Sequence, residues 1–100
     1  MTDSNKLPVS IDWRNTNPSV VSPVKDQGTC GCCWAFSALG SLESAYAITN
    51  GVLVDLSEQN LNDCVYGEDG CMGGWMSDAW TYIQAKNGID TESAYPYDLF

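Results

Sequence analysis

The chain has 100 residues, of which 44% are hydrophobic and 11% aromatic, and it carries a formal net charge of −9. A chain of this length forms one domain at most, and its apolar content favours a packed core over disorder. Its four basic residues are scattered, which excludes a nucleic acid as partner, and no apolar run approaches the roughly 20 residues that span a bilayer. Residues 1–6 lack the basic and apolar segments of a signal peptide, and we interpret them as a leader or an expression remnant.

The first part of the chain, from Leu7 to Thr29, is rich in Pro, Ser and Asn and is expected to be extended or looped. A helix is then predicted from about Cys33 to Asn50, because apolar residues recur at three- and four-residue steps. Gly51 is expected to end it, since glycine tolerates the left-handed conformation that closes many helices. The residues expected on its apolar face are Ala35, Ala38, Leu39, Leu42, Ala45 and Tyr46.

A second, shorter helix is predicted to begin after Ser57, a residue type that caps helix N-termini well. Leu56 and Leu61 occupy the two positions of a hydrophobic staple around that cap. A glycine-rich loop, Gly67 to Gly74, is expected to follow.

A third helix is predicted from about Trp75 to Lys86, ended by Asn87 and Gly88. Its inward-facing residues are expected to be Met76, Ala79, Trp80 and Ile83. The sequence therefore predicts a mainly α, small, loop-rich three-helix domain, and this pattern alone indicates no function.

The segment from Gln27 to Ser37 carries the candidate chemistry. Cys33 lies where a loop becomes the first turn of a helix, and the unpaired N–H groups and the dipole there favour an anion. The thiolate is the reactive form of cysteine. Gln27 is placed to aim its amide at an oxyanion beside the sulfur, together with the backbone N–H of Cys33. Spacing alone leaves open a buried structural cysteine beside an ordinary loop glutamine.

The same segment resembles the active-site region of papain and the cathepsins, with the local signature Cys-Gly-[Ser/Ala]-Cys-[Trp/Tyr]. Here Cys30 to Trp34 read Cys-Gly-Cys-Cys-Trp. The resemblance covers residues 7–100 and is closest to the cathepsin L-like branch of the papain-like cysteine proteases. It implies the helical, disulfide-linked L-domain of the papain-like α+β fold. Further matching segments are Asp12–Arg14, Pro23–Gly28, Leu56–Cys64, Gly70–Gly74 and Tyr95–Tyr97.

The resemblance also implies catalytic and structural roles. Cys33 matches the nucleophile of the family, and Gln27 matches the side chain that donates to the oxyanion. Cys30 and Cys71 match a disulfide that joins the active-site loop to the substrate-binding loop. No metal site and no cofactor are implied.

Four residues match the family's substrate-binding positions. The backbone of Gly73 and Gly74 would pair with an extended peptide, whereas by themselves these glycines indicate only a tight turn. Trp75 and Met76 match one wall of the pocket for an apolar side chain next to the scissile residue. Without the resemblance, both would be interpreted as core residues.

Three departures from the family pattern change what is expected. The catalytic histidine and its orienting asparagine lie about 130–150 residues beyond the nucleophile in the family, in a β-rich second half, and this chain has no histidine. Cys32 stands where serine is usual, either as a tolerated small residue or as a thiol that caps or oxidises Cys33. Cys64 matches a cysteine whose partner would lie beyond Phe100, so a free or mispaired thiol is expected.

The leading hypothesis is the nucleophile-bearing half of a cysteine endopeptidase, which cuts peptide bonds through a thioester on Cys33 and has little or no activity alone. Its expected partners are a peptide or protein substrate, a complementary R-domain, and further copies held through exposed apolar surface.

The alternative is a non-catalytic module that grips a propeptide, a cystatin-like inhibitor or an extended peptide. A third hypothesis, thiol or metal chemistry at the clustered cysteines, is disfavoured by their spacing. The family is lysosomal or secreted, and five cysteines suit an oxidising compartment.

Overall fold

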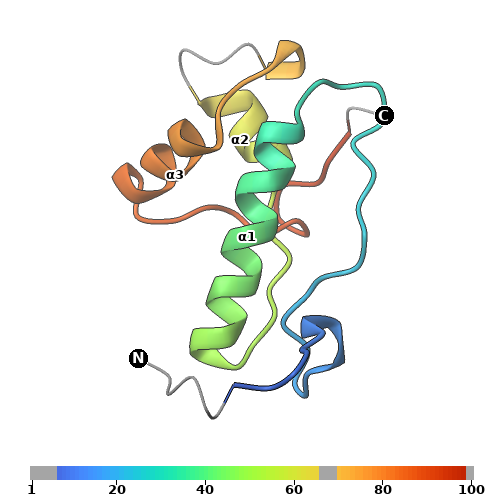
Figure 1. The fold of residues 1–100 in the computed structure, drawn as a ribbon. Helices are drawn as coiled ribbons and strands as arrows, with labels where there is room; N and C mark the ends of the chain where they lie inside the picture. Colours follow the sequence, from blue (N-terminus) through green and yellow to red (C-terminus); the bar gives the residue numbers. More distant parts are fainter. Residues whose placement is uncertain (1–6, 66–69, 99–100) are drawn as a thin grey trace.

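The computed structural model describes residues 7–65 and 70–98, which contain three α-helices and two short 3-10 helices (Figure 1). The α-helices are α1 (Cys33–Asn50), α2 (Glu58–Cys64) and α3 (Met76–Ala85), and the 3-10 helices are η2 (Trp13–Asn15) and η3 (Gly70–Met72). Over these ranges the β-structure is an isolated antiparallel bridge between Leu56 and Thr91. The predicted mainly helical, three-helix domain is confirmed. The leader at residues 1–6 and the start of the predicted glycine-rich loop lie outside the described residues.

Helix α1 runs through the centre of the molecule, and both α2 and α3 pack against it (Figure 1). The helix ends as predicted, because Gly51 adopts a φ of 75° and its N–H bonds to the carbonyl of Ala47 at 2.8 Å. Its buried residues are Trp34, Ala35, Ala38, Leu39, Glu43 and Ala47.

The predicted apolar face of α1 is right in its first half and wrong in its second. Ala35, Ala38 and Leu39 are buried as expected, but Ala45 and Tyr46 are exposed. Glu43 and Ala47 are buried in their place. A polar residue therefore occupies a core position, and its partners are described below with the active-site segment.

Helix α2 begins with the cap that the sequence predicts. The hydroxyl oxygen of Ser57 accepts a hydrogen bond from the N–H of Asn60 at 3.0 Å. The same hydroxyl donates to the carbonyl of Tyr95 at 2.6 Å and so joins the cap to the C-terminal segment. Leu61 is fully buried, and Leu56 packs against the same core cluster.

Helix α3 and the segment that precedes α1 lie on opposite sides of α1 (Figure 1). Ala79 is buried, and Met76 and Ile83 are half-buried against the core. Trp80 is 45% exposed, although its indole N–H donates to the carbonyl of Ala38 at 3.1 Å. The predicted inward face is therefore right except for the ring of Trp80.

The core is a cluster at the first half of α1. It consists of Cys30, Cys32, Trp34, Ala35, Ala38, Leu39, Leu61 and Ala79. None of the described helices is both long and apolar enough to cross a membrane. The core thus lies directly beneath the loop that precedes α1, and it supports the residues in which the sequence placed the chemistry.

Candidate active site

Cys33 is the first residue of α1 and is exposed to solvent. The residue before it, Cys32, caps the helix through its backbone, since its carbonyl accepts from the N–H groups of Ala35 and Phe36 at 2.9 and 3.3 Å. No acidic residue lies in the first turn. The first N–H groups of a helix have no acceptor within it, and this end carries a partial positive charge. The sulfur of Cys33 is therefore accessible at the positive end of an 18-residue helix.

The loop before α1 is joined to η3 by a disulfide between Cys30 and Cys71, as the resemblance implied. Next to it, the N–H of Gly31 donates to the carbonyl of Cys71 at 2.7 Å. A Cβ at position 31 would collide with that same carbonyl oxygen, so the approach requires glycine. The sequence predicted no role for Gly31, although the glycine of the Cys-Gly-[Ser/Ala]-Cys signature marks its position.

Gln27 is half-buried in the loop that leads to Cys33. Its side-chain amide donates to the carbonyl of Cys30 at 2.6 Å, which fixes the side chain against the disulfide-bonded loop. A glutamine amide has two N–H groups, and one of them is engaged by this bond. The backbone carbonyl of Gln27 accepts from the hydroxyl of Tyr97 at 2.5 Å, a contact that the sequence did not predict.

The three free cysteines among the described residues differ in exposure: Cys33 is exposed, Cys64 is half-buried, and Cys32 is buried. The sulfur of Cys32 lies 3.2 Å from the hydroxyl of Tyr97. Cys32 therefore faces the interior and Cys33 faces solvent, an arrangement that favours Cys32 as a small core residue over a thiol that caps Cys33. The expectation that Cys64 has a free thiol agrees with the structure.

The four residues matched to substrate binding begin two positions after Cys71 in the chain. Gly73 has a φ of 127°, a value that favours glycine, and Gly74 is half-buried. Trp75 precedes the first residue of α3 and is 69% exposed, so it is not a core residue. Met76 begins α3 and is half-buried against the core. The Cys30–Cys71 disulfide brings this segment to the loop that carries Gln27 and Cys33.

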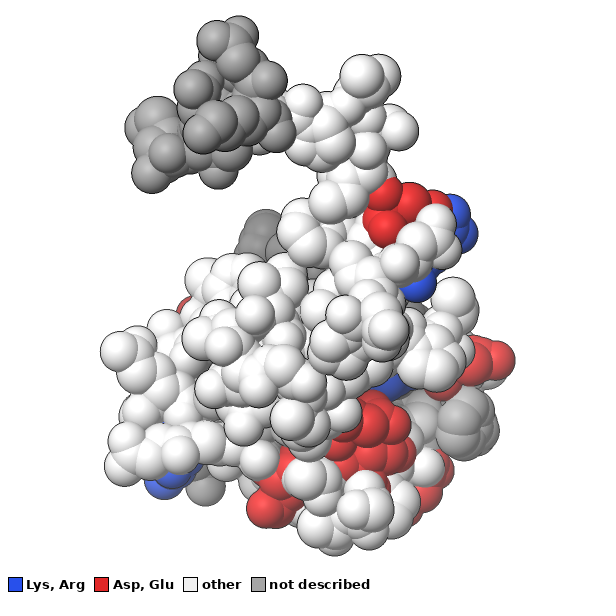
Figure 2. All heavy atoms as spheres, turned by 90° about the horizontal axis from the view of Figure 1, so that it is seen from below, with Lys and Arg blue, Asp and Glu red and all other residues white. Residues whose placement is uncertain are grey.

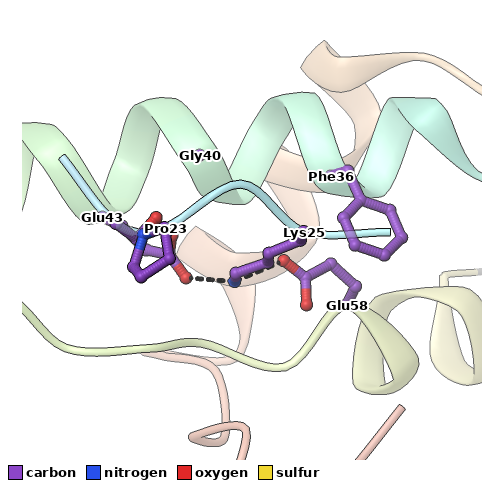
Figure 3. A pocket seen from close by; sticks show the side chains of 7 residues that line it. Pro23, Lys25, Phe36, Gly40, Glu43 and Glu58 are labelled. Carbon is purple, nitrogen blue, oxygen red and sulfur yellow. Dashed lines mark hydrogen bonds and ion pairs between the residues drawn. The ribbon is translucent and has the colours of Figure 1, made fainter. Parts of the chain in front are cut away.

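A second group of polar side chains lies beside the middle of α1, where Lys25 contacts three carboxylates. Its ammonium group is 2.8 Å from both Glu43 and Glu58 and 2.6 Å from Asp55. Figure 3 shows Lys25, Glu43 and Glu58 pointing toward one another in a cavity of about 190 Å³. The side chains of Glu43 and Glu58 are 0% and 2% exposed.

The carboxylate of Glu43 accepts further hydrogen bonds. The hydroxyl of Ser22 donates to it at 3.0 Å and the backbone N–H of Leu56 at 2.8 Å. These bonds explain why a glutamate occupies a buried position on α1, since a buried charge needs a partner and hydrogen bonds.

The charges of this group perturb one another. Burial alone would lower the pKa of Lys25, but hydrogen bonds to Asp55, Glu43 and Glu58 outweigh it and raise that pKa. Burial raises the pKa of Glu58, and the hydrogen bond from Lys25 only partly offsets this effect. In the view of Figure 2, the largest group of acidic side chains lies in the lower half of the surface, and the basic side chains appear as separate spots, some of them beside acidic ones. Over residues 7–65 and 70–98, no set of three His, Cys, Asp or Glu side chains is arranged to hold a metal ion.

The chain matches a known protein family over most of its length. Residues 7–99 match the model of the family described as papain family cysteine protease. Digestive cysteine proteinase 2 of Homarus americanus is 58% identical over 90 residues, which are 88% of this chain and 27% of that protein. Cathepsin L1 of Drosophila melanogaster is 55% identical over 94 residues, which are 92% of this chain and 25% of that protein.

A solved structure shows the same fold. Bromelain from Ananas comosus, determined in complex with the inhibitor E64, superposes with a TM-score of 0.85 at 44% identity. The match covers 93% of this chain and 42% of bromelain. The chain therefore spans only a part of the length of each of the proteins that it matches.

Proposed function

Because this chain belongs to the papain family of cysteine proteases, we propose that it is the nucleophile-bearing half of a cysteine endopeptidase. The observation that carries the proposal is the position of Cys33, exposed at the first residue of α1 and next to the disulfide-bonded loop. The relatives support the cathepsin L-like branch, since they include proteins named cathepsin L1 and cathepsin L-like peptidase.

In the proposed reaction the thiolate of Cys33 attacks the carbonyl carbon of a peptide bond and forms a carbon–sulfur bond. The carbonyl oxygen becomes an oxyanion, which accepts from the backbone N–H of Cys33 and from the free amide N–H of Gln27. When the oxyanion collapses, the carbon–nitrogen bond breaks and the amine leaves with a proton. Water then hydrolyses the thioester, which restores the thiol and releases the carboxylic acid.

Two steps need a proton donor or acceptor: the amine takes up a proton as it leaves, and water gives one up when it attacks the thioester. In the family a histidine serves both steps, and this chain has no histidine. The chain spans about a quarter of the two relatives described above. We therefore assign the base, and the other wall of the substrate cleft, to a complementary R-domain. The lone chain is expected to show little or no turnover.

The test uses a fluorogenic peptide with an apolar residue at the second position before the cut. Turnover is measured for the chain alone and after mixing with the remaining part of the Homarus americanus relative. Turnover that requires both parts is expected, and it should be lost in Cys33→Ala but kept in the matched control Cys64→Ala. Robust turnover by the chain alone would contradict the predicted incompetence, and activity that survives Cys33→Ala would contradict the nucleophile.

Ligands of the proposed site are an extended peptide or an inhibitor that contacts Cys33. E64 is present in the solved bromelain complex, and we propose that it attaches to Cys33 in this chain. Mass spectrometry of the labelled protein locates the adduct. An adduct on Cys64 in place of Cys33 would count against the site.

Self-association is proposed from exposed apolar side chains before α1, which in a monomer would face water. These are Leu7, Val9, Ile11, Trp13, Val21 and Val24. Sedimentation velocity over a range of concentrations is expected to show dimers or larger species; a monomer throughout would refute this. A lysosomal or secreted parent protein is proposed from the disulfide and from the relative named a digestive proteinase.

A further inference from the structure

The peptide unit between Gln27 and Gly28 is held at both of its ends. Its carbonyl oxygen, on Gln27, accepts from the hydroxyl of Tyr97 at 2.5 Å. Its N–H, on Gly28, donates to the carboxylate of Asp26 at 2.8 Å. Gly28 has a φ of 68°, and glycine populates positive and negative φ about equally, so rotation of this unit meets little steric resistance. The two hydrogen bonds are therefore what orients it.

Tyr97 is itself firmly placed, although it lies in the extended C-terminal segment. Its ring packs edge-on against Phe36 of α1, with centroids 5.2 Å apart. Its backbone N–H donates to the carboxylate of Glu92 at 2.9 Å. Its hydroxyl hydrogen is directed to Gln27, so the hydroxyl oxygen is left to accept from the thiol of Cys32 at 3.2 Å.

The hydroxyl of Tyr97 stays a donor over the working pH range. Burial raises the pKa of this hydroxyl above its ordinary value. The hydroxyl of Tyr97 thus connects the buried thiol of Cys32 to the backbone of Gln27, the residue matched to the oxyanion donor.

We propose that Tyr97 is a positioning residue for the oxyanion hole, because its hydroxyl fixes the Gln27 peptide unit and so aims the Gln27 amide beside Cys33. The inference rests on the proposed function and adds a residue from the opposite end of the chain. Tyr97 does not touch the reacting atoms. Without its hydroxyl, the 27–28 peptide unit keeps only its bond to Asp26, and the backbone from which the Gln27 amide reaches the carbonyl of Cys30 is less firmly placed.

Two reagents separate positioning from a general structural role. A p-nitrophenyl ester acylates Cys33: the carbon–sulfur bond forms, the carbonyl oxygen becomes an oxyanion, and when the oxyanion collapses the carbon–oxygen bond to the leaving group breaks and p-nitrophenolate leaves. Iodoacetamide alkylates the same sulfur at a saturated carbon, with loss of iodide and without an oxyanion. The ratio of the two rates therefore reports the oxyanion hole, and because p-nitrophenolate leaves without a proton, the 100-residue chain can be used.

The test compares Tyr97→Phe with the matched control Tyr95→Phe, whose hydroxyl donates to Asp63 at 2.6 Å and not to the Gln27 loop. The acylation-to-alkylation ratio is expected to fall about tenfold in Tyr97→Phe, because removing an oxyanion donor costs about 10²–10³-fold and a displaced donor keeps part of its effect. It should be unchanged in Tyr95→Phe.

A ratio equal to wild type in Tyr97→Phe would overturn the proposal, as would an equal fall of both rates. Asp26→Ala removes the acceptor of the Gly28 N–H at the other end of the same peptide unit. Because Asp26 is exposed, this variant allows the acylation-to-alkylation ratio to be measured if Tyr97→Phe fails to fold. A ratio unaffected by Asp26→Ala would then overturn it. These outcomes are independent of the proposed endopeptidase activity, which is judged by peptide turnover in the presence of the complementary half.

Discussion

Replacing Lys25 with methionine removes the cation that lies among three carboxylates while keeping a side chain of similar length. Glu43 and Glu58 are 0% and 2% exposed, so the variant leaves two buried carboxylates without their counter-ion. Breaking a buried ion pair costs about 3–5 kcal/mol. Lys25 itself is 24% exposed and water screens it in part, so the lower end, about 3 kcal/mol, is expected.

That loss is a large part of the roughly 5–15 kcal/mol by which a small domain is stable. It corresponds to a fall in melting temperature on the order of 15 °C for a domain of this size. Urea denaturation followed by circular dichroism measures it directly. The matched control is Lys86→Met, at an exposed lysine that follows α3, which should change the free energy of unfolding by less than about 0.5 kcal/mol.

The loss should also depend on pH. The pKa of Glu58 is already raised in the folded state, so the folded domain binds that proton more tightly than the unfolded chain does. Lowering the pH toward 5 therefore favours the folded state through protonation of Glu58. The effect is larger in Lys25→Met, because the lysine no longer offsets the burial of Glu58. Lys25 stays protonated from pH 5 to 7 because its pKa is raised. The difference between variant and wild type should thus be largest at pH 7 and shrink toward pH 5.

Two results would refute this reasoning. One is a loss in Lys25→Met no larger than that in Lys86→Met, which would mean that the carboxylates find other partners or water. The other is a loss of equal size at pH 5 and pH 7, which would mean that lost packing, and not buried charge, destabilises the variant.

Two further predictions concern the active-site segment. Gly31→Ala should lower the free energy of unfolding by about 1–3 kcal/mol, since its Cβ would meet the Cys71 carbonyl. The control Gly40→Ala has open space around its Cβ in α1 and should be neutral or stabilising. Equal effects of the two substitutions in urea denaturation would refute this. Iodoacetamide should modify the exposed Cys33 first and the half-buried Cys64 more slowly, as mass spectrometry of a time course would show; earlier modification of Cys64 would contradict the structure.

Much of the local structure could be predicted from short-range patterns. The bounds of α1, its closing glycine and the Ser57 cap depend on residues within a turn or two of one another. The position of Cys33 at a helix start follows from the same patterns, because a loop composition changes there to a helical period. The Cys30–Cys71 pairing came from the family resemblance, since five cysteines allow several pairings.

The face predicted for α1 failed in its second half because it was predicted from apolar spacing alone. Glu43 is polar and occupies a core position, since its carboxylate bonds to Lys25, 18 residues away. The buried face of α1 therefore includes Glu43 and Ala47, and Tyr46 is exposed. Trp80 was placed inside by its period, whereas its size leaves part of the ring in solvent.

The sequence by itself therefore determined the helices, their caps and the position of Cys33 at the start of α1, because these depend on local backbone preferences and apolar spacing. Only the tertiary structure decided how the active-site loop is held. Gly31 lies against Cys71, and Tyr97 bonds to Gln27 across 70 residues of sequence. Such contacts depend on close approach between distant segments, which is set by the packing of the whole core and leaves no periodic signal in the chain.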